Sequence, residues 1–230
     1  MIQRYCIRPR RDAAYAAAME NVIAVYTAPP DPNRPVVCFD EGGKELRADQ
    51  RQRRPPRPGQ PAQEDYAFVR RGVANLFVAV APHLGTRFLW SSARRTAVDF
   101  AHAMRHLVDD CFPDAEQLVL VLDNLNTHTT AALYTAFPPA EACRIASRLD
   151  FHYTPKHGSW MHLAEVELAA LQRMCLNQRI ADRATLDRYL ATYVARRNAE
   201  AKPIRWRFTL EEARSNLHTV YPIIEPDKHD

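Results

Sequence analysis

Two acidic residues each follow an unbroken apolar run, and acids in that position can do chemistry. Asp123 comes directly after the run 118–122, and Asp40 comes directly after the run 36–39. A short apolar run bounded by turn residues is typical of a strand that is buried on both faces. An acid that ends such a strand lies at the carboxyl edge of the sheet, where open α/β sheets bind ligands. The two carboxylates are therefore candidate ligands of a hard divalent cation such as Mg²⁺.

Asp123 also has a purely structural interpretation. Aspartate is a preferred N-cap residue, so Asp123 could simply begin the next helix. Asn126 and Thr127 follow closely and could cap that helix instead. This leaves Asp123 available for a site, and the residues alone support both interpretations.

Phosphodiester chemistry needs little from a protein beyond such acids. Two divalent ions about 3.5–4 Å apart can hold the attacking and the leaving oxygen. A third acid is therefore expected on the helix after the last strand, where Glu165 and Glu167 stand. These two lie about 200° apart around a helix, so both cannot face one site. Glu167 falls on the apolar arc of the helix and Glu165 lies opposite it, and the spacing does not decide between them.

The rest of the chain supplies the elements that position these acids. Apolar runs predict strands at 36–41, 44–47, 66–71, 75–81, 86–90, 118–122 and 151–154, with a Gly42-Gly43 turn closing a hairpin between the first two. Helical spacing predicts helices at 12–26, 93–111, 129–136, 141–148, 160–175 and 184–197, and Thr209 with Glu212 forms a capping box for a further one. This order predicts an α/β fold, with a mixed β-sheet flanked by helices.

Two segments stand out from this pattern. Residues 1–35 read as a basic helical arm and a proline-rich linker, which places a domain boundary before 36–230. Residues 51–63 are rich in proline, glutamine and arginine and cannot form a packed core. Their arginines could track a phosphate backbone or could simply line a solvated loop; they are Arg51, Arg53, Arg54 and Arg57.

The bulk composition excludes several classes of protein. The chain has 230 residues, 47% of them hydrophobic and 25% charged, as is usual for a globular protein. No apolar run approaches the roughly 20 residues of a membrane span, and the N-terminus lacks the apolar region of a secretory signal. Five scattered cysteines favour reduced thiols in a cytosolic protein. The formal net charge is +4, and 27 of the 31 cations are arginines. This excess suits phosphate contacts, and GC-rich codon usage would explain it equally well.

Three motifs in order resemble the catalytic domain of DDE transposases, in the branch of bacterial insertion-sequence relatives of the mariner superfamily. They are Val-Cys-Phe-Asp40-Glu, then Leu-Val-Leu-Asp123-Asn-Leu-Asn-Thr-His128, then a run from His152 through Lys-His-Gly-Ser-Trp-Met-His-Leu-Ala to Glu165. The segments from Arg94-Arg95 to His102 and Trp206 to Thr209 extend the resemblance, which covers the chain from about Arg4 to Tyr221. Ordered motifs are far more specific than any single one.

The resemblance implies an RNase H-like fold with Asp40, Asp123 and Glu165 as catalytic, metal-binding acids. It also implies two Mg²⁺ or Mn²⁺ ions as cofactors, cutting of DNA at transposon ends, and attack of the freed 3′-hydroxyl on target DNA. The implied partners are transposon-end and target DNA and a second copy of the chain in a homodimer. No membrane is implied, and a bacterial cytoplasmic, nucleoid-associated location is expected.

The sequence departs from the family pattern at two points. His162 stands where the family usually has Asn, and it could act as an added ligand, as a cation near the acids, or as a tolerated substitution. No segment before Asp40 is long enough for the usual helix-turn-helix modules. We therefore expect a truncated frame, a lost module, or a separate helix-turn-helix polypeptide as partner.

Secondary candidates surround the acids. His128 could contact DNA or a site water, although a histidine at a helix start is more often structural. Lys156 and His157, with Ser159, could bind phosphate at the start of the following helix, or form a plain surface loop. Arg94 and Arg95, with the arginines of 51–63, are weaker DNA-binding candidates.

Three further residues are expected to be structural. Glu41 points away from Asp40 in a strand and is expected to be non-catalytic. Trp160 and Trp206 could stack on bases, but core packing is favoured.

Two hypotheses compete with a transposase enzyme. One is a non-catalytic DNA-binding or dimerising remnant that keeps the fold, and the other is a structure-selective nuclease. Retention of all three acids favours an enzyme, although a fold alone does not prove a function.

Overall fold

The computed structural model describes residues 10–223, and its centre is one five-stranded sheet in the order β3-β2-β1-β4-β5. β1 (Val36–Asp49), β2 (Phe68–Ala81) and β3 (Thr86–Ser92) are antiparallel neighbours. β4 (Leu118–Leu122) and β5 (Leu149–Tyr153) run parallel to β1. The predicted mixed α/β sheet is therefore confirmed.

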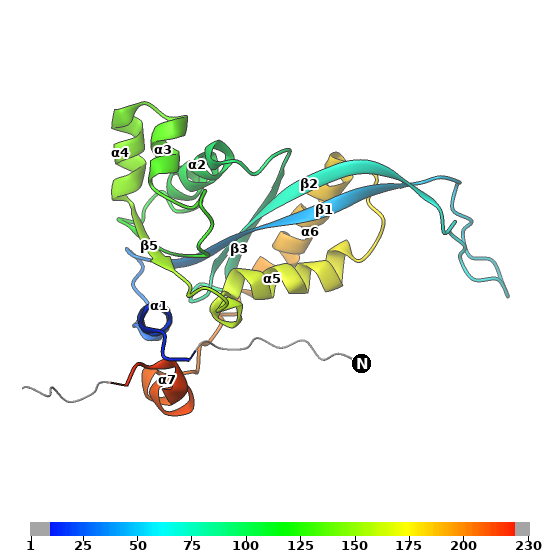
Figure 1. Cartoon of the computed structure of the whole chain (residues 1–230). Helices are drawn as coiled ribbons and strands as arrows, with labels where there is room; N and C mark the ends of the chain where they lie inside the picture. Colours follow the sequence, from blue (N-terminus) through cyan, green and yellow to red (C-terminus); the bar gives the residue numbers. More distant parts are fainter. Residues whose placement is uncertain (1–9, 224–230) are drawn as a thin grey trace, which may run out of the picture.

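β1 and β2 are longer than predicted and form a ribbon that projects from the body of the molecule (Figure 1). The predicted turn at Gly42-Gly43 is wrong, because β1 continues straight through it. Gly42 lies beneath α5, where an added Cβ would come within 3.0 Å of Leu168 Cδ2. This glycine therefore permits close packing of a helix on the strand rather than a reversal of the chain.

The predicted break between 71 and 75 is also wrong. Gly72 adopts a φ of +94°, and the β1–β2 register shifts between Glu45 and Arg47. A glycine with positive φ opposite a register shift is typical of a β-bulge, which bends a strand without ending it.

Helices cover both faces of the sheet (Figure 1). α2 (Ala97–His106), α3 (Ala131–Ala136) and α4 (Pro139–Ser147) cover one face over a core of phenylalanine, leucine and alanine side chains. α1 (Ala13–Thr27) and α5 (Leu163–Leu171) cover the other face. β4 lies between these two layers, which is why its five residues are continuously apolar.

The remaining helices flank this body. α6 (Arg183–Glu200) packs over β3 and closes a third apolar cluster with the end of α5. α7 (Leu210–Asn216) begins at the predicted capping box of Thr209 and packs on α1, where Arg214 pairs with Glu20 at 2.8 Å. Short 3-10 turns at Ser159–Met161 and His218–Val220 and π-helical turns at Leu107–Cys111 and Gln172–Leu176 complete the chain.

The helix expected in the N-terminal arm is present as α1. Its N-cap is Asp12, whose side chain accepts a hydrogen bond from the Tyr15 N–H, and its apolar stripe is buried against the sheet. Residues 1–9, which include the first basic residues of the arm, lie outside the described residues, and the expected boundary at residue 35 stays a prediction. No helix within 10–223 is long and apolar enough to span a membrane.

Candidate active site

The ends of β1 and β4 bring Asp40 and Asp123 side by side. The two strands are parallel with Cys38 paired to Val121, so the acids two residues further on occupy matching positions. Side chains two residues apart point to the same face of a sheet. Cys38 and Val121 both belong to the apolar cluster beneath α1 and α5, so the two acids are directed toward that same face.

Glu165 joins them from the first turn of α5. β5 pairs with β4 up to Tyr153, and the loop that follows leads through the turn Ser159–Met161 into this helix. Asp123 and Glu165 line one hollow of about 310 Å³ together with residues 154–159 of that loop. The predicted acids from three separate elements therefore lie around one edge of the sheet.

The pKa values show that the three carboxylates interact. Burial, together with the nearby charges of Asp123 and Glu165, raises the pKa of Asp40 to about 7, against the opposing effects of a hydrogen bond from the Glu41 N–H and of the nearby His128. Burial and the charge of Asp123 also raise the pKa of Glu165, although a hydrogen bond with Ser159 opposes this. Gathering negative charge in a partly buried place is unfavourable without a cation.

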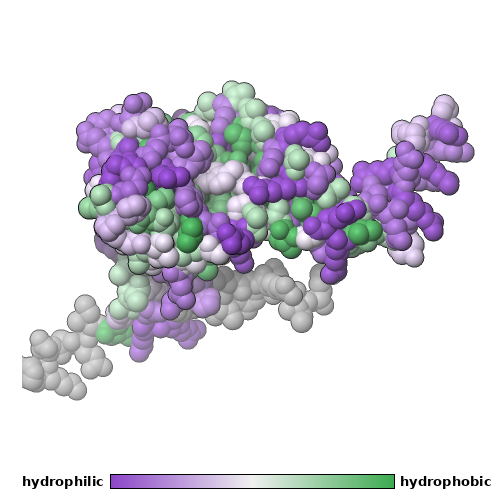
Figure 2. Space-filling view, turned by 90° about the horizontal axis from the view of Figure 1, so that it is seen from above, coloured by the Kyte–Doolittle hydropathy of each residue, from purple (hydrophilic) through white to green (hydrophobic). Residues whose placement is uncertain are grey.

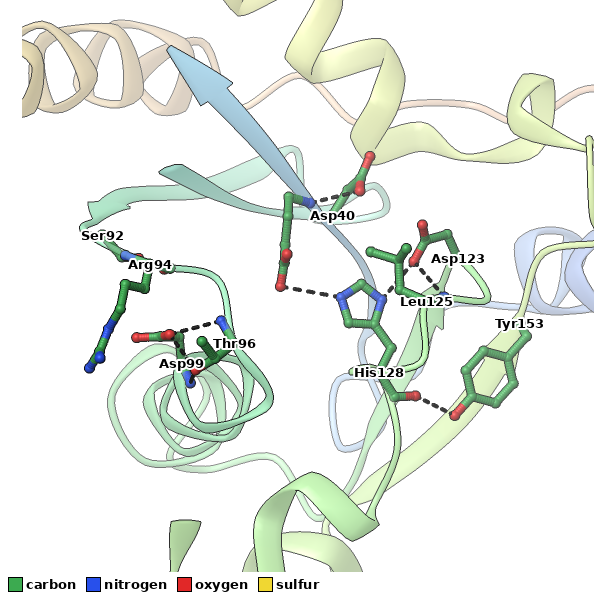
Figure 3. Close-up of polar contacts among 10 residues, drawn as sticks. Asp40, Ser92, Arg94, Thr96, Asp99, Asp123, Leu125, His128 and Tyr153 are labelled. Carbon is green, nitrogen blue, oxygen red and sulfur yellow. Dashed lines mark hydrogen bonds and ion pairs between the residues drawn. The ribbon is translucent and has the colours of Figure 1, made fainter. Parts of the chain in front are cut away.

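His128 lies at the centre of the polar contacts at this edge (Figure 3). Its Nδ1 is 2.6 Å from Asp123 Oδ1, an ion-pair contact. Its Nε2 is 3.3 Å from Glu41 Oε1. Although burial lowers the pKa of His128, its contacts with these two acids raise it to about 9. The same contact outweighs burial at Asp123 and lowers the pKa of that carboxyl.

The positions of His128 and Glu41 refine two predictions. His128 is fully buried, stacked on Phe100 at 4.7 Å between ring centroids. Glu41 does point away from the Asp40 side, as predicted, but it is buried and contacts His128. Sequence spacing could not reveal this contact, because it depends on how the loop between Asp123 and His128 folds around the end of β4.

His162 is completely buried beside the acids. Burial lowers its pKa to about 4, so its imidazole is neutral near pH 7. Neither ring nitrogen has a well-formed hydrogen bond within the described residues. The role of His162, as an added ligand, a cation near the acids or a tolerated substitution, stays a prediction.

The donor set fits hard divalent cations by its chemistry. All three acids offer carboxylate oxygens, which Mg²⁺ and Mn²⁺ prefer. Across residues 10–223, neither Asp40 nor Glu165 forms an ion pair with an arginine or lysine. In the same range, no three His, Cys, Asp or Glu side chains are placed closely enough to hold one ion. The fit therefore rests on charge and donor type rather than on a finished coordination shell.

The secondary basic candidates fall into two groups. Lys156 and His157 are exposed on the loop that lines the hollow, beside Asp123 and Glu165. Arg94 and Arg95 are exposed before α2, and Figure 3 shows Arg94 pointing away from Asp40 and Asp123. Only the first pair is brought to the acidic edge.

The ribbon arginines lie on the projecting loop between β1 and β2, whose surface is hydrophilic (Figure 2). Arg51 pairs with Asp65 at 3.4 Å, and Arg53 pairs with Asp49 at 2.7 Å. Arg54 and Arg57 are exposed and have no acidic partner in the part of the chain that the structure describes. The charge of this loop is therefore partly neutralised by its own acids.

Glu167 has a structural role. It is 3% exposed and receives hydrogen bonds from Tyr193 at 2.6 Å and from Arg87 and Arg197 at 3.3 Å each. These contacts outweigh burial and lower its pKa. Helical spacing correctly predicted that Glu167 lies on the buried arc, and its partners show why it can be charged there.

The two tryptophans are half-buried and pack against the core, as favoured from the sequence. Trp160 stacks on Trp206 with ring centroids 6.3 Å apart, against the cluster beneath α1.

Sheet order, helical layers and acids at the sheet edge together define an RNase H-like fold, which this chain shares with solved transposase structures. The sequence matches the family described as DDE superfamily endonuclease over residues 35–187, which is more than half of the chain. The chain therefore belongs to that family. The strands that carry Asp40 and Asp123 and the helix that carries Glu165 all fall within the matched residues.

Solved structures agree on the fold. The Mos1 mariner paired end complex with Mn is 14% identical, with a TM-score of 0.55 over 85% of this chain and 59% of that chain. The Mos1 complex with Mg is 16% identical, with a TM-score of 0.59 over 96% of this chain and 67% of that chain. The Mos1 strand transfer complex is 16% identical, with a TM-score of 0.56 over 87% of this chain and 60% of that chain. This chain thus spans about 60% of the length of the first of these transposases, and no curated protein matches its sequence.

Proposed function

We propose that this chain is the catalytic domain of a transposase that cuts DNA at transposon ends and joins the resulting 3′-hydroxyl to target DNA. The observation that carries the proposal is the meeting of Asp40, Asp123 and Glu165, from three elements, at one edge of the sheet. Membership of the endonuclease family and the fold shared with Mos1 structures support it.

In this proposal the three acids bind two divalent ions, Mg²⁺ or Mn²⁺. When bound, the ions would activate the attacking oxygen and stabilise the leaving oxygen of an in-line displacement. The chain's own residues provide fixed negative charge at three points around the scissile phosphate. The rigid neighbouring strands hold two of these points, and the helix α5 holds the third.

With DNA bound in this way, the loop 154–159 lies next to the DNA backbone, beside the acids. Lys156 and His157 are exposed on it and can contact phosphates next to the scissile one. Arg54 and Arg57, exposed on the projecting loop, can contact DNA further away. Such contacts position DNA without reading its sequence, so recognition of transposon ends falls to other parts of the assembly.

Four finer statements belong to the same proposal. The enzyme is placed in the bacterial insertion-sequence branch and acts as a homodimer. A separate helix-turn-helix polypeptide recognises the transposon ends, and the location is the bacterial cytoplasm, at the nucleoid. The motif resemblance supports the first two.

The test is nicking of supercoiled plasmid with Mg²⁺ or Mn²⁺, comparing the wild type with Asp123→Ala. We expect metal-dependent nicking by the wild type and none by the variant. Asp114→Ala serves as a control, because this exposed aspartate precedes β4 and so lies at the opposite end of that strand from Asp123. Equal nicking by wild type and Asp123→Ala would refute the proposal. DNA binding in a gel-shift assay without any nicking would favour the alternative of a non-catalytic remnant.

A further inference from the structure

The polar chain from Glu41 through His128 to Asp123 spans the end of the sheet. Glu41 follows Asp40 in β1 and points to the opposite face, toward α2. His128 lies on that opposite face, packed on Phe39 and Phe100. Its Nε2 faces Glu41 Oε1 at 3.3 Å, and its Nδ1 faces Asp123 Oδ1 at 2.6 Å. One buried imidazole therefore connects an acid on one face with a candidate metal ligand on the other.

Asp40 and Asp123, the candidate metal ligands from the strands, are both restrained by contacts of this Glu41–His128–Asp123 series. The Glu41 N–H donates a 2.7 Å hydrogen bond to Asp40 Oδ1. The Leu125 N–H approaches Asp123 Oδ1 at 3.4 Å, so that oxygen has two donors near it. Within residues 10–223 no hydrogen bond or ion pair engages Asp123 Oδ2. The contacts of this carboxylate thus converge on Oδ1, and Asp123 also lines the hollow.

His128 is itself fixed on every side. Its backbone carbonyl accepts a 2.7 Å hydrogen bond from the Tyr153 hydroxyl, and its N–H donates to the Leu125 carbonyl at 2.9 Å. Its ring lies against the Phe100 ring at an interplanar angle of 29°. A fully buried, stacked ring cannot easily rotate, so its two nitrogens define fixed directions.

We propose that Glu41 and His128 are positioning residues that hold the Asp123 carboxylate in the orientation needed to bind metal. This inference rests on the proposed function, because it assigns a task to residues behind the candidate ligands. Partners behind a metal ligand fix its orientation, and their loss typically lowers metal affinity or activity by about 10–100-fold.

The decisive variant is His128→Phe, which keeps an aromatic ring against Phe100 but removes both nitrogens. Binding of Mn²⁺ alone to the full chain is measured by isothermal titration calorimetry, and thermal unfolding is measured in parallel. We expect Mn²⁺ affinity to fall by about 10–100-fold in a variant that remains folded. A folded His128→Phe protein that binds Mn²⁺ as tightly as the wild type would overturn the inference.

Glu41→Gln tests the same series of polar contacts with a smaller chemical change. It keeps an oxygen that can accept from His128 and leaves the backbone N–H on Asp40 unchanged, so we expect a smaller loss of Mn²⁺ affinity of a few fold. The double variant should bind Mn²⁺ no more weakly than His128→Phe alone, because Glu41 acts on Asp123 only through His128. If His128→Phe does not fold, unchanged Mn²⁺ affinity in folded Glu41→Gln overturns the inference.

Two controls separate this inference from the proposed function. His106→Phe removes a histidine that pairs with Asp110 at 2.7 Å on the surface of α2, and it should leave Mn²⁺ binding unchanged. Asp123→Ala should lose Mn²⁺ binding. A wild type that neither binds Mn²⁺ nor nicks DNA overturns both proposals, whereas a wild type that does both while His128→Phe binds equally well overturns only the positioning role.

Discussion

Two glutamates on α5, only two residues apart, experience opposite surroundings. Glu167 is buried among Arg87, Arg197 and the Tyr193 hydroxyl, and these contacts lower its pKa. Glu165 faces a hollow that it shares with Asp123, and burial with that neighbouring charge raises its pKa. The first carboxylate is neutralised by the protein itself, and the second is not.

This difference separates two kinds of buried acid. A carboxylate with its own cations and donors ties elements together, here α5 to β3 and α6. A carboxylate that gathers with other carboxylates is in an unfavourable state that a bound cation would relieve. The two classes should therefore respond to substitution in opposite ways, one in activity and the other in stability.

The largest effect is expected for Glu165→Gln. The variant should lose DNA nicking by about a thousandfold, because a ligand of the ions is worth several kcal/mol in the transition state. Its free energy of unfolding without metal should not fall, since a repelling charge is removed. Nicking rates with Mg²⁺ measure the activity, and chemical denaturation in EDTA measures the free energy of unfolding without metal. A thousandfold activity loss accompanied by an equally large stability loss would erase the distinction between the glutamates.

Glu167→Gln should show the reverse. Arg87 is 3% exposed, and removing the charge beside it leaves a buried guanidinium without its ion-pair partner. Breaking a buried pair in this way costs about 3 kcal/mol or more. Denaturant unfolding would measure the loss, with Glu165→Gln as the matched control. Unaltered stability would mean that the network around Glu167 does not hold α5 in place.

The smallest effect concerns pH. The pKa of Asp40 is raised to about 7 in the folded chain, so the folded state keeps a proton that the unfolded state releases near pH 4. The Asp40 contribution to stability is therefore fully favourable at low pH and is lost as pH rises through 7. Without metal, the free energy of unfolding should fall by about 2 kcal/mol between pH 5 and pH 7 relative to Asp40→Asn. Parallel pH profiles of the two proteins would contradict the raised pKa.

The sequence located Asp40 and Asp123 because each directly follows an apolar run, and the end of such a run predicts the end of a strand. β4 spans the residues predicted for it, and the acid that follows lies at the sheet edge as expected. The same kind of signal failed at Gly42-Gly43, where two glycines suggested a turn. There the deciding contact is with Leu168, more than a hundred residues away, and no local pattern contains it.

The surroundings of the acids were less predictable for the same reason. Periodicity placed Glu167 on a buried face, but its partners come from β3 and α6. Alternation turned Glu41 away from Asp40, but only the folded loop shows that His128 meets it there. Contacts between distant segments are determined by packing, which a single sequence does not display.

β1 runs as one strand from the sheet edge, where Asp40 lies, into the projecting ribbon. The ten residues from Asp40 to Asp49 form one strand of about 30 Å that joins the sheet edge to the base of the projecting loop. The projecting ribbon and the first acid are therefore carried by one β-strand, on which α5 packs closely at Gly42.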